Sequence, residues 1–184
     1  MKREQKRVTF FGGAFDPPHM GHYLAAAYFL ACEPKDELWL IPSYQHPYDK
    51  QMAPFGSRVR WCTMMAKILG PRASVSLIEQ EIHGVGRTYV VLQALKERFT
   101  DTRFRMIVGA DAYADRHKWY NAELLEKELD FFAIGRGART AEGRLAMPDV
   151  SSTEIRERLA KGASCNGLLP AKVLEDVLRS RCYG

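Results

Sequence analysis

The chain has 184 residues, of which 46% are hydrophobic, and this length is enough to bury the core of one domain. Its net charge is +5, but its 27 basic residues are dispersed, which argues against a nucleic-acid-binding tract. No apolar run has the length of a transmembrane helix and no signal peptide precedes the first strand, so we expect a cytoplasmic protein. The four cysteines form no C-x-x-C pair, so we expect free thiols and no metal site.

Hydrophobic runs alternate along the chain between strand-like and helix-like patterns, which is typical of a parallel sheet wrapped by helices. We predict strands over residues 8–11, 37–41, 74–78, 105–108 and 131–134. Helices are expected over residues 19–32, 57–69, 88–98, 112–116, 122–127, 152–160 and 171–179. This order predicts an α/β fold with a Rossmann-like, doubly wound parallel sheet of about five strands.

The same pattern predicts a single domain over residues 1–184. Its sheet core is expected over residues 7–135 and a small helical part over residues 150–184. Residues 135–147 are expected to form a mobile loop between the sheet and the C-terminal helices. Ligands of open parallel sheets bind beyond the carboxyl ends of the strands, so we expect the site where the first strand ends.

The first predicted strand ends at a glycine pair, Gly12 and Gly13, which lets the backbone turn tightly and approach a ligand. A helix is expected after the two prolines that follow, with His19 and His22 on one face of its first turn. The N-terminus of that helix adds N–H groups and a partial positive charge. These features together predict a phosphate site, although neither a P-loop nor a dinucleotide-cofactor fingerprint is present.

A second candidate phosphate site lies before the predicted helix at residues 152–160. Ser151 and Glu154 form a capping box, which predicts a helix N-terminus at this point. The hydroxyls of Ser152 and Thr153 add donors there, and Arg156 adds a cation suited to bidentate phosphate contact. Taken alone, the segment favours an ordinary capped helix with a surface arginine over a phosphate site.

The segment GGAFDPPHMGH over residues 12–22 resembles the GGxFDPxHxGH motif of the nucleotidylyltransferase superfamily, and in particular of the bacterial nicotinate-nucleotide adenylyltransferases. Residues 150–156 are similar to the family's ISSTxIR motif, with valine for the first isoleucine, and residues 109–111 resemble its GAD motif. The similarity extends over residues 8–177. It implies transfer of an adenylyl group from ATP to nicotinate mononucleotide, which gives deamido-NAD and pyrophosphate.

The resemblance assigns roles to the residues that match the motifs. The catalytic residues that it implies are His19, His22, Lys50 and Arg156. The residues that it implies for ATP binding are Gly12, Gly13, Ala14, Phe15, His22, Gly109, Asp111, Ser152, Thr153 and Arg156. Those that it implies for the acceptor are Phe15, His19, Thr88 and Trp119, with Trp119 stacking on the pyridine ring and Thr88 helping to hold the carboxylate.

Several of these residues also have ordinary structural explanations. Asp111 is placed to cap a helix as well as to contact a ribose, Trp119 suits a core, and Lys50 suits a solvated loop. The chain also departs from the family pattern: Val90 and Val91 replace an Asp-Thr pair, and residues 42–50 replace a PPHK-like element. Lys50 is the best counterpart of the lysine in that element, and His46 replaces part of it.

The implied mechanism is an in-line attack by the mononucleotide phosphate on the α-phosphorus of ATP, without a covalent intermediate. Catalysis would rest on positioning and charge neutralisation, with Mg²⁺ held mainly by the substrate phosphates. ATP and nicotinate mononucleotide are the expected partners, with no membrane and no nucleic acid. A homo-oligomer is left open.

Alternative functions differ in kind. One keeps the chemistry and changes the acceptor to nicotinamide mononucleotide or phosphopantetheine, or transfers a cytidylyl group to a polyol phosphate. Another is a non-catalytic nucleotide-binding or RNA-binding regulator, in which the set of His19, His22 and Arg156 would have no purpose. Class I aminoacyl-tRNA synthetases have a similar His-x-Gly-His element, but 184 residues leave no room for a tRNA-binding domain.

Overall fold

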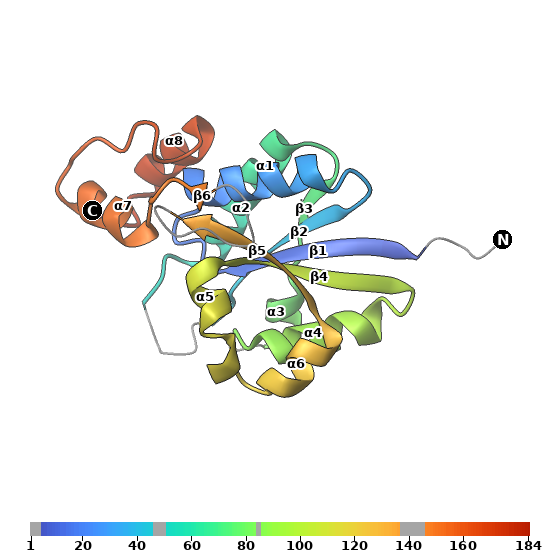
Figure 1. Cartoon of the computed structure of the whole chain (residues 1–184). Coiled ribbons are helices and arrows are strands. Elements are labelled where there is room, and N and C mark those ends of the chain that lie inside the picture. Colours follow the sequence, from blue (N-terminus) through green and yellow to red (C-terminus); the bar gives the residue numbers. More distant parts are fainter. Residues whose placement is uncertain (1–4, 46–50, 84–85, 137–145) are drawn as a thin grey trace.

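The protein is described by a computed structural model over residues 5–45, 51–83, 86–136 and 146–184. Its centre is a parallel sheet with the strand order β3-β2-β1-β4-β5-β6 (Figure 1). The strands are β1 Lys6–Gly13, β2 Glu37–Pro42, β3 Ala73–Val75, β4 Thr102–Gly109, β5 Asp130–Arg136 and β6 Ala146–Met147. The predicted doubly wound α/β fold is confirmed, with six strands in the described residues instead of about five.

Helices cover both faces of this sheet (Figure 1). They are α1 Met20–Cys32, α2 Phe55–Leu69, α3 Ile78–Glu81, α4 Thr88–Arg98, α5 Ala110–Ala114, α6 Ala122–Glu128, α7 Ser152–Ala160 and α8 Ala171–Ser180, with a 3₁₀ turn at Arg116–Lys118. α1 and α2 pack on one face, and α3, α4 and α6 pack on the other. Within the described residues, no helix is long and apolar enough to cross a membrane.

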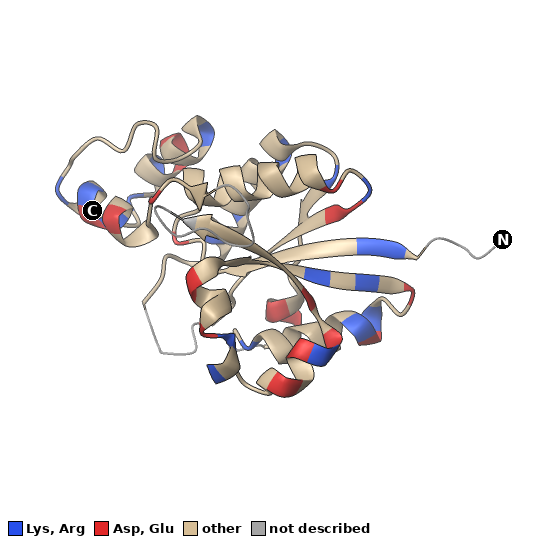
Figure 2. Ribbon diagram, in the orientation of Figure 1, with Lys and Arg blue, Asp and Glu red and all other residues tan. Residues whose placement is uncertain are grey.

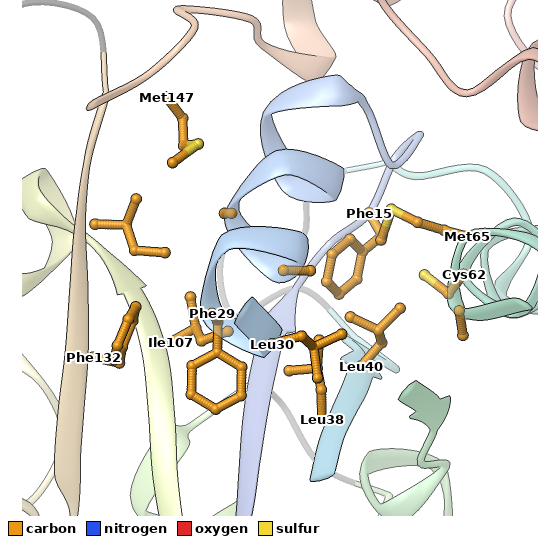
Figure 3. Close-up of a cluster of buried hydrophobic side chains, with 14 residues drawn as sticks. Phe15, Phe29, Leu30, Leu38, Leu40, Cys62, Met65, Ile107, Phe132 and Met147 are labelled. Carbon is orange, nitrogen blue, oxygen red and sulfur yellow. The ribbon is translucent and has the colours of Figure 1, made fainter. Parts of the chain in front are cut away.

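The central strands are hydrophobic because both of their faces are covered. On one face, Phe29 of α1 meets Phe132 of β5 edge to face, with ring centroids 5.1 Å apart (Figure 3). On the other face, Phe10 of β1 packs with Leu92 and Leu95 of α4. β1 and β4 pair only as far as Phe10 and Met106, and beyond that pair each strand continues against its other neighbour, at the point where the strand order reverses direction.

Two parts of the secondary structure differ from the sequence prediction. The strand predicted over residues 74–78 is shorter, because the Ser76 hydroxyl accepts a hydrogen bond from the Ile78 amide and a helical turn, α3, begins at Ile78. The loop predicted over residues 135–147 has paired ends, since Gly135 and Arg136 of β5 lie opposite Ala146 and Met147 of β6. A two-residue strand has too short a pattern to be recognised in the sequence.

Candidate functional site

A pocket of about 510 Å³ opens at the carboxyl ends of β1 and β4. Gly12 and Gly13 of β1 and Gly109 of β4 line one part of it, and Thr88 and Trp119 line another. These five residues were predicted from the sequence to belong to an ATP site and an acceptor site, and in the structure they all line one cavity. The cavity lies at the reversal point of the strand order, where open parallel sheets bind their ligands.

The turn after β1 is held together by aromatic packing. Phe15 has φ +46° and is 1% exposed, and its side chain lies in the same buried cluster as Met65 and Cys62 of α2 (Figure 3). The His22 ring stands edge-on to Phe15 at a centroid distance of 4.9 Å. The side chain of Phe15, predicted to bind both substrates, therefore supports His22 from the protein interior.

The two histidines form a stacked pair at the start of α1. His19 is the N-cap residue, and its ring lies 3.7 Å from the His22 ring between centroids. The His19 amide donates to Nδ1 of His22 at 3.2 Å, so in a neutral His22 ring the proton is on Nε2. A Cβ atom on Gly21 would lie 3.0 Å from the His19 ring, which explains the small residue between them. This arrangement gives His22 an Nε2–H donor, as a phosphate site requires.

The N-terminus of α7 is joined to the turn after β1. The predicted cap is confirmed, because Ser151 Oγ accepts from the Glu154 amide at 3.1 Å. Ser152 Oγ donates to the Pro17 carbonyl at 3.0 Å, and Nη1 of Arg156 donates to the Asp16 carbonyl at 2.8 Å. The two phosphate motifs of the sequence therefore meet in space.

The remaining predicted site residues have different surroundings. Trp119 lines the pocket and also packs on Phe131, at a centroid distance of 6.2 Å, so the residue has a core contact and a position at the cavity. Asp111 lies in the first turn of α5, beyond the N-cap residue Gly109. Lys50 and His46 lie outside the described residues.

Two buried charged residues of the site gave no clear functional signal in the sequence. Arg58 of α2 is 1% exposed and donates to the carbonyl oxygens of Ala14 at 2.9 Å and Ser43 at 2.7 Å, which ties together the segments after β1 and β2. Glu79 is 4% exposed, lines the pocket and accepts from the Tyr44 amide at 3.0 Å. Burial raises the pKa of Glu79 to about 7. In the sequence, Glu79 stands out locally only as an acidic residue that directly follows the apolar residues Leu77 and Ile78.

Comparison with known proteins places this site in a family. A model described as Cytidylyltransferase-like matches residues 10–158. A probable nicotinate-nucleotide adenylyltransferase of Anaeromyxobacter dehalogenans (strain 2CP-C) is 37% identical over 182 residues, which covers 97% of each chain. One of Myxococcus xanthus (strain DK1622) is 37% identical over 184 residues, covering 99% of this chain and 97% of that one.

Solved structures agree on the fold. The nicotinic acid mononucleotide adenylyltransferase of Plasmodium falciparum, complexed with NaAD, has a TM-score of 0.82 at 20% identity and covers 97% of both chains. A putative nicotinate-nucleotide adenylyltransferase of Vibrio parahaemolyticus has a TM-score of 0.77 at 23% identity, over 97% of this chain and 95% of that one. With its sequence relatives and its two joined motifs, the chain belongs to the nicotinate-nucleotide adenylyltransferases of the cytidylyltransferase-like family.

Proposed function

We propose that the protein transfers the adenylyl group of ATP to nicotinate mononucleotide, which gives deamido-NAD and pyrophosphate. The main support for this proposal is that the two phosphate motifs are in contact. Arg156 donates a hydrogen bond to the Asp16 carbonyl, beside the glycine turn that lines the pocket. A phosphate donor and a phosphate acceptor would thus share one edge of the sheet. The names of the curated relatives support the choice of acceptor.

The chemistry needs no proton transfer by the protein. An ionised oxygen of the acceptor phosphate forms a bond to the α-phosphorus of ATP, and the bond from that phosphorus to the bridging oxygen of the β-phosphate breaks. Pyrophosphate leaves with the electron pair. Because both reactants carry several negative charges, the protein contributes by aligning them and by stabilising the charge that develops on the phosphate oxygens.

Three groups at the turn are suited to that stabilisation. Nε2–H of His22 would donate to the α-phosphate, and the stacked His19 would contact the adjacent phosphate region of the acceptor. Arg156 lies at the N-terminus of α7, where its guanidinium and the first amides of the helix would face the β- and γ-phosphates. Thr153 would add a hydroxyl donor beside it, and Ser152, whose hydroxyl donates to the Pro17 carbonyl, would contribute its backbone amide.

A magnesium ion fits this site as a companion of ATP. Within the described part of the chain, no group of three or more His, Cys, Asp or Glu residues is placed to hold a metal ion. Binding mainly by the substrate phosphates is common for this hard cation, and we propose that mode here. When bound, it would neutralise charge on the leaving pyrophosphate.

The acceptor would occupy the pocket of about 510 Å³. Trp119 offers a ring face for the pyridine, and Thr88 stands at the first position of α4, where its amide and hydroxyl would meet the nicotinate carboxylate. The pocket lining also includes Arg87, and its positive charge favours an acid over an amide.

The test is pyrophosphate release measured with nicotinate mononucleotide and nicotinamide mononucleotide side by side. We expect a higher kcat/KM with the acid. A strong preference for the amide would overturn the substrate assignment, and no release with either acceptor would overturn the reaction. Phosphopantetheine and a polyol phosphate with CTP serve as further acceptor controls.

A further inference from the structure

Asp16 occupies the centre of the joint between the two phosphate motifs. Its side chain is 1% exposed, and Oδ1 accepts hydrogen bonds from the Ala53 amide at 2.9 Å and from the Tyr183 hydroxyl at 2.6 Å. Oδ2 lies 3.5 Å from Nη1 of Arg156, the same atom that donates to the Asp16 carbonyl. The position of this carboxylate therefore decides where the guanidinium can lie.

Tyr183 reaches Asp16 from the far end of the chain, 167 residues away. After α8 the chain reverses at Arg181, which has φ +49°, and Tyr183 returns toward the turn after β1. The Tyr183 ring packs beside Trp61 of α2 at a centroid distance of 5.9 Å. Trp61 is fixed in turn, because its Nε1 donates to Asp176 of α8 at 2.9 Å. These contacts hold the Tyr183 ring in place beside Trp61.

We propose that Tyr183 is a positioning residue for ATP: its hydroxyl fixes the Asp16 carboxylate, and Asp16 holds the Arg156 guanidinium in the orientation that receives the ATP phosphates. This inference rests on the proposed function, since it names Arg156 as an ATP contact. Burial and the hydrogen bond to Asp16 raise the pKa of Tyr183 well above its ordinary value, so at neutral pH the phenol is protonated and donates to Asp16.

The Tyr183 hydroxyl and the Arg156 guanidinium both compensate the charge of the buried Asp16 carboxylate. With Tyr183 and Ala53 on Oδ1, the carboxylate is hydrogen-bonded from the side away from Arg156. Without the phenol hydroxyl, Oδ1 keeps a single hydrogen-bond donor, and Arg156, whose Nη1 lies 3.5 Å from Oδ2, compensates more of the buried charge beside the electrostatic interaction of Asp16 with Arg58. A guanidinium drawn onto Asp16 is less available to a phosphate.

The test is the variant Tyr183→Phe, which removes one hydroxyl and keeps the ring on Trp61. We expect KM for ATP to rise about three- to tenfold, the range for losing one hydrogen bond, while KM for the acceptor changes less than about twofold. An equal rise of both KM values, or no rise, would overturn the proposal. The matched control is Leu174→Ala, which weakens the packing of α8 in the same cluster and should lower Tm without changing KM for ATP.

A double-mutant cycle separates positioning from a general structural effect. If Tyr183 acts through Arg156, adding Tyr183→Phe to the variant Arg156→Lys should change KM for ATP less than about twofold. Additive changes would contradict the proposal. If Tyr183→Phe does not fold, Tyr183→Leu replaces it, because it also removes the hydroxyl and keeps an apolar side chain beside Trp61, and it should raise KM for ATP with the same selectivity.

Equilibrium binding of ATP to the wild-type protein and to Tyr183→Phe keeps this inference separate from the proposed function. Weaker ATP binding in the variant supports the positioning role even if no acceptor gives pyrophosphate. Equal binding in the two proteins overturns the positioning role even if wild-type turnover is normal.

Discussion

The amino and carboxyl ends of the sheet use positive charge in opposite ways. At the amino end, each strand cation has an acid beside it: Arg7 lies 2.8 Å from Asp36, and Arg105 lies 2.8 Å from Glu33 (Figure 2). At the carboxyl end, Arg156 contacts a backbone carbonyl at 2.8 Å and its nearest carboxylate oxygen lies at 3.5 Å. The amino-end cations are closely paired with acids, whereas Arg156 has one carboxylate at a longer distance and is the cation that we propose binds the ATP phosphates.

This difference predicts two classes of variant. Residues at the carboxyl end should affect turnover or substrate binding more than unfolding, because their polar atoms face the proposed ligands. Residues at the amino end should affect unfolding more than turnover, because their partners are other side chains. Each prediction below tests one side of this comparison.

The largest effect is expected from His22→Ala. Removing the donor to the α-phosphate should lower kcat about 100- to 1,000-fold, with a small change in Tm, as measured by pyrophosphate release and thermal unfolding. His117→Ala is the matched control, because this exposed histidine lies in the 3₁₀ turn Arg116–Lys118 and should leave both quantities unchanged. Normal turnover of His22→Ala would remove His22 from the reaction.

Next is Trp119→Ala, which should raise KM for the mononucleotide about tenfold or more and KM for ATP much less, through the loss of a stacking face. The same change removes packing on Phe131, so some loss of stability is also expected. Trp119→Phe keeps an aromatic face and should recover most of the acceptor affinity. Equal KM changes for both substrates would contradict an acceptor role.

At the amino end, Asp36→Asn should lower the free energy of unfolding by about 1–3 kcal/mol, measured by urea denaturation. Asp36 is buried, pairs with Arg7 and accepts a hydrogen bond from Thr9 at 3.3 Å, so the neutral amide loses the ion pair. We expect kcat to stay within about twofold of the wild type. A large loss of kcat with unchanged stability would reverse the comparison.

The smallest effect concerns Glu79, which is an exception at the carboxyl end because its buried carboxylate accepts the Tyr44 amide, and it is seen as a pH dependence of stability. Its pKa is about 7 in the folded protein, above the ordinary 4.5, so the native state binds its proton more tightly than the unfolded state does. The stability from this group is present below about pH 4.5 and is lost as pH rises through about 7.

Urea unfolding at about pH 5 and about pH 8 should therefore show a larger loss of stability in the wild type than in Glu79→Gln, by about 1–2 kcal/mol. The amide of the Glu79→Gln variant does not titrate, so this position adds no pH-dependent contribution to the variant's free energy of unfolding. An equal pH dependence of the two proteins would show that Glu79 does not titrate in this range.

Much of the fold could be predicted because its signals are local. The alternation of apolar runs gave the two faces of the sheet, and Gly12 and Gly13 marked the end of β1. β6 and α3 could not be predicted, since a two-residue strand and a four-residue helix depend on tertiary partners more than on their own pattern.

The site shows the same division. The histidine pair and the cap at Ser151 are local and were predicted. The hydrogen bond from Ser152 to Pro17 spans 135 residues, and that from Tyr183 to Asp16 spans 167, so no window of sequence contains either. Glu79 resembles any surface acid until burial changes its environment.

The most direct test of adenylyl transfer follows the α-phosphate of ATP. The purified protein is incubated with nicotinate mononucleotide and ATP labelled at the α-phosphate, and the products are separated. The account predicts that the label enters deamido-NAD, in equal amount to the unlabelled pyrophosphate released, and that omitting the mononucleotide stops both. Label in released phosphate or pyrophosphate, or no labelled dinucleotide, would contradict it.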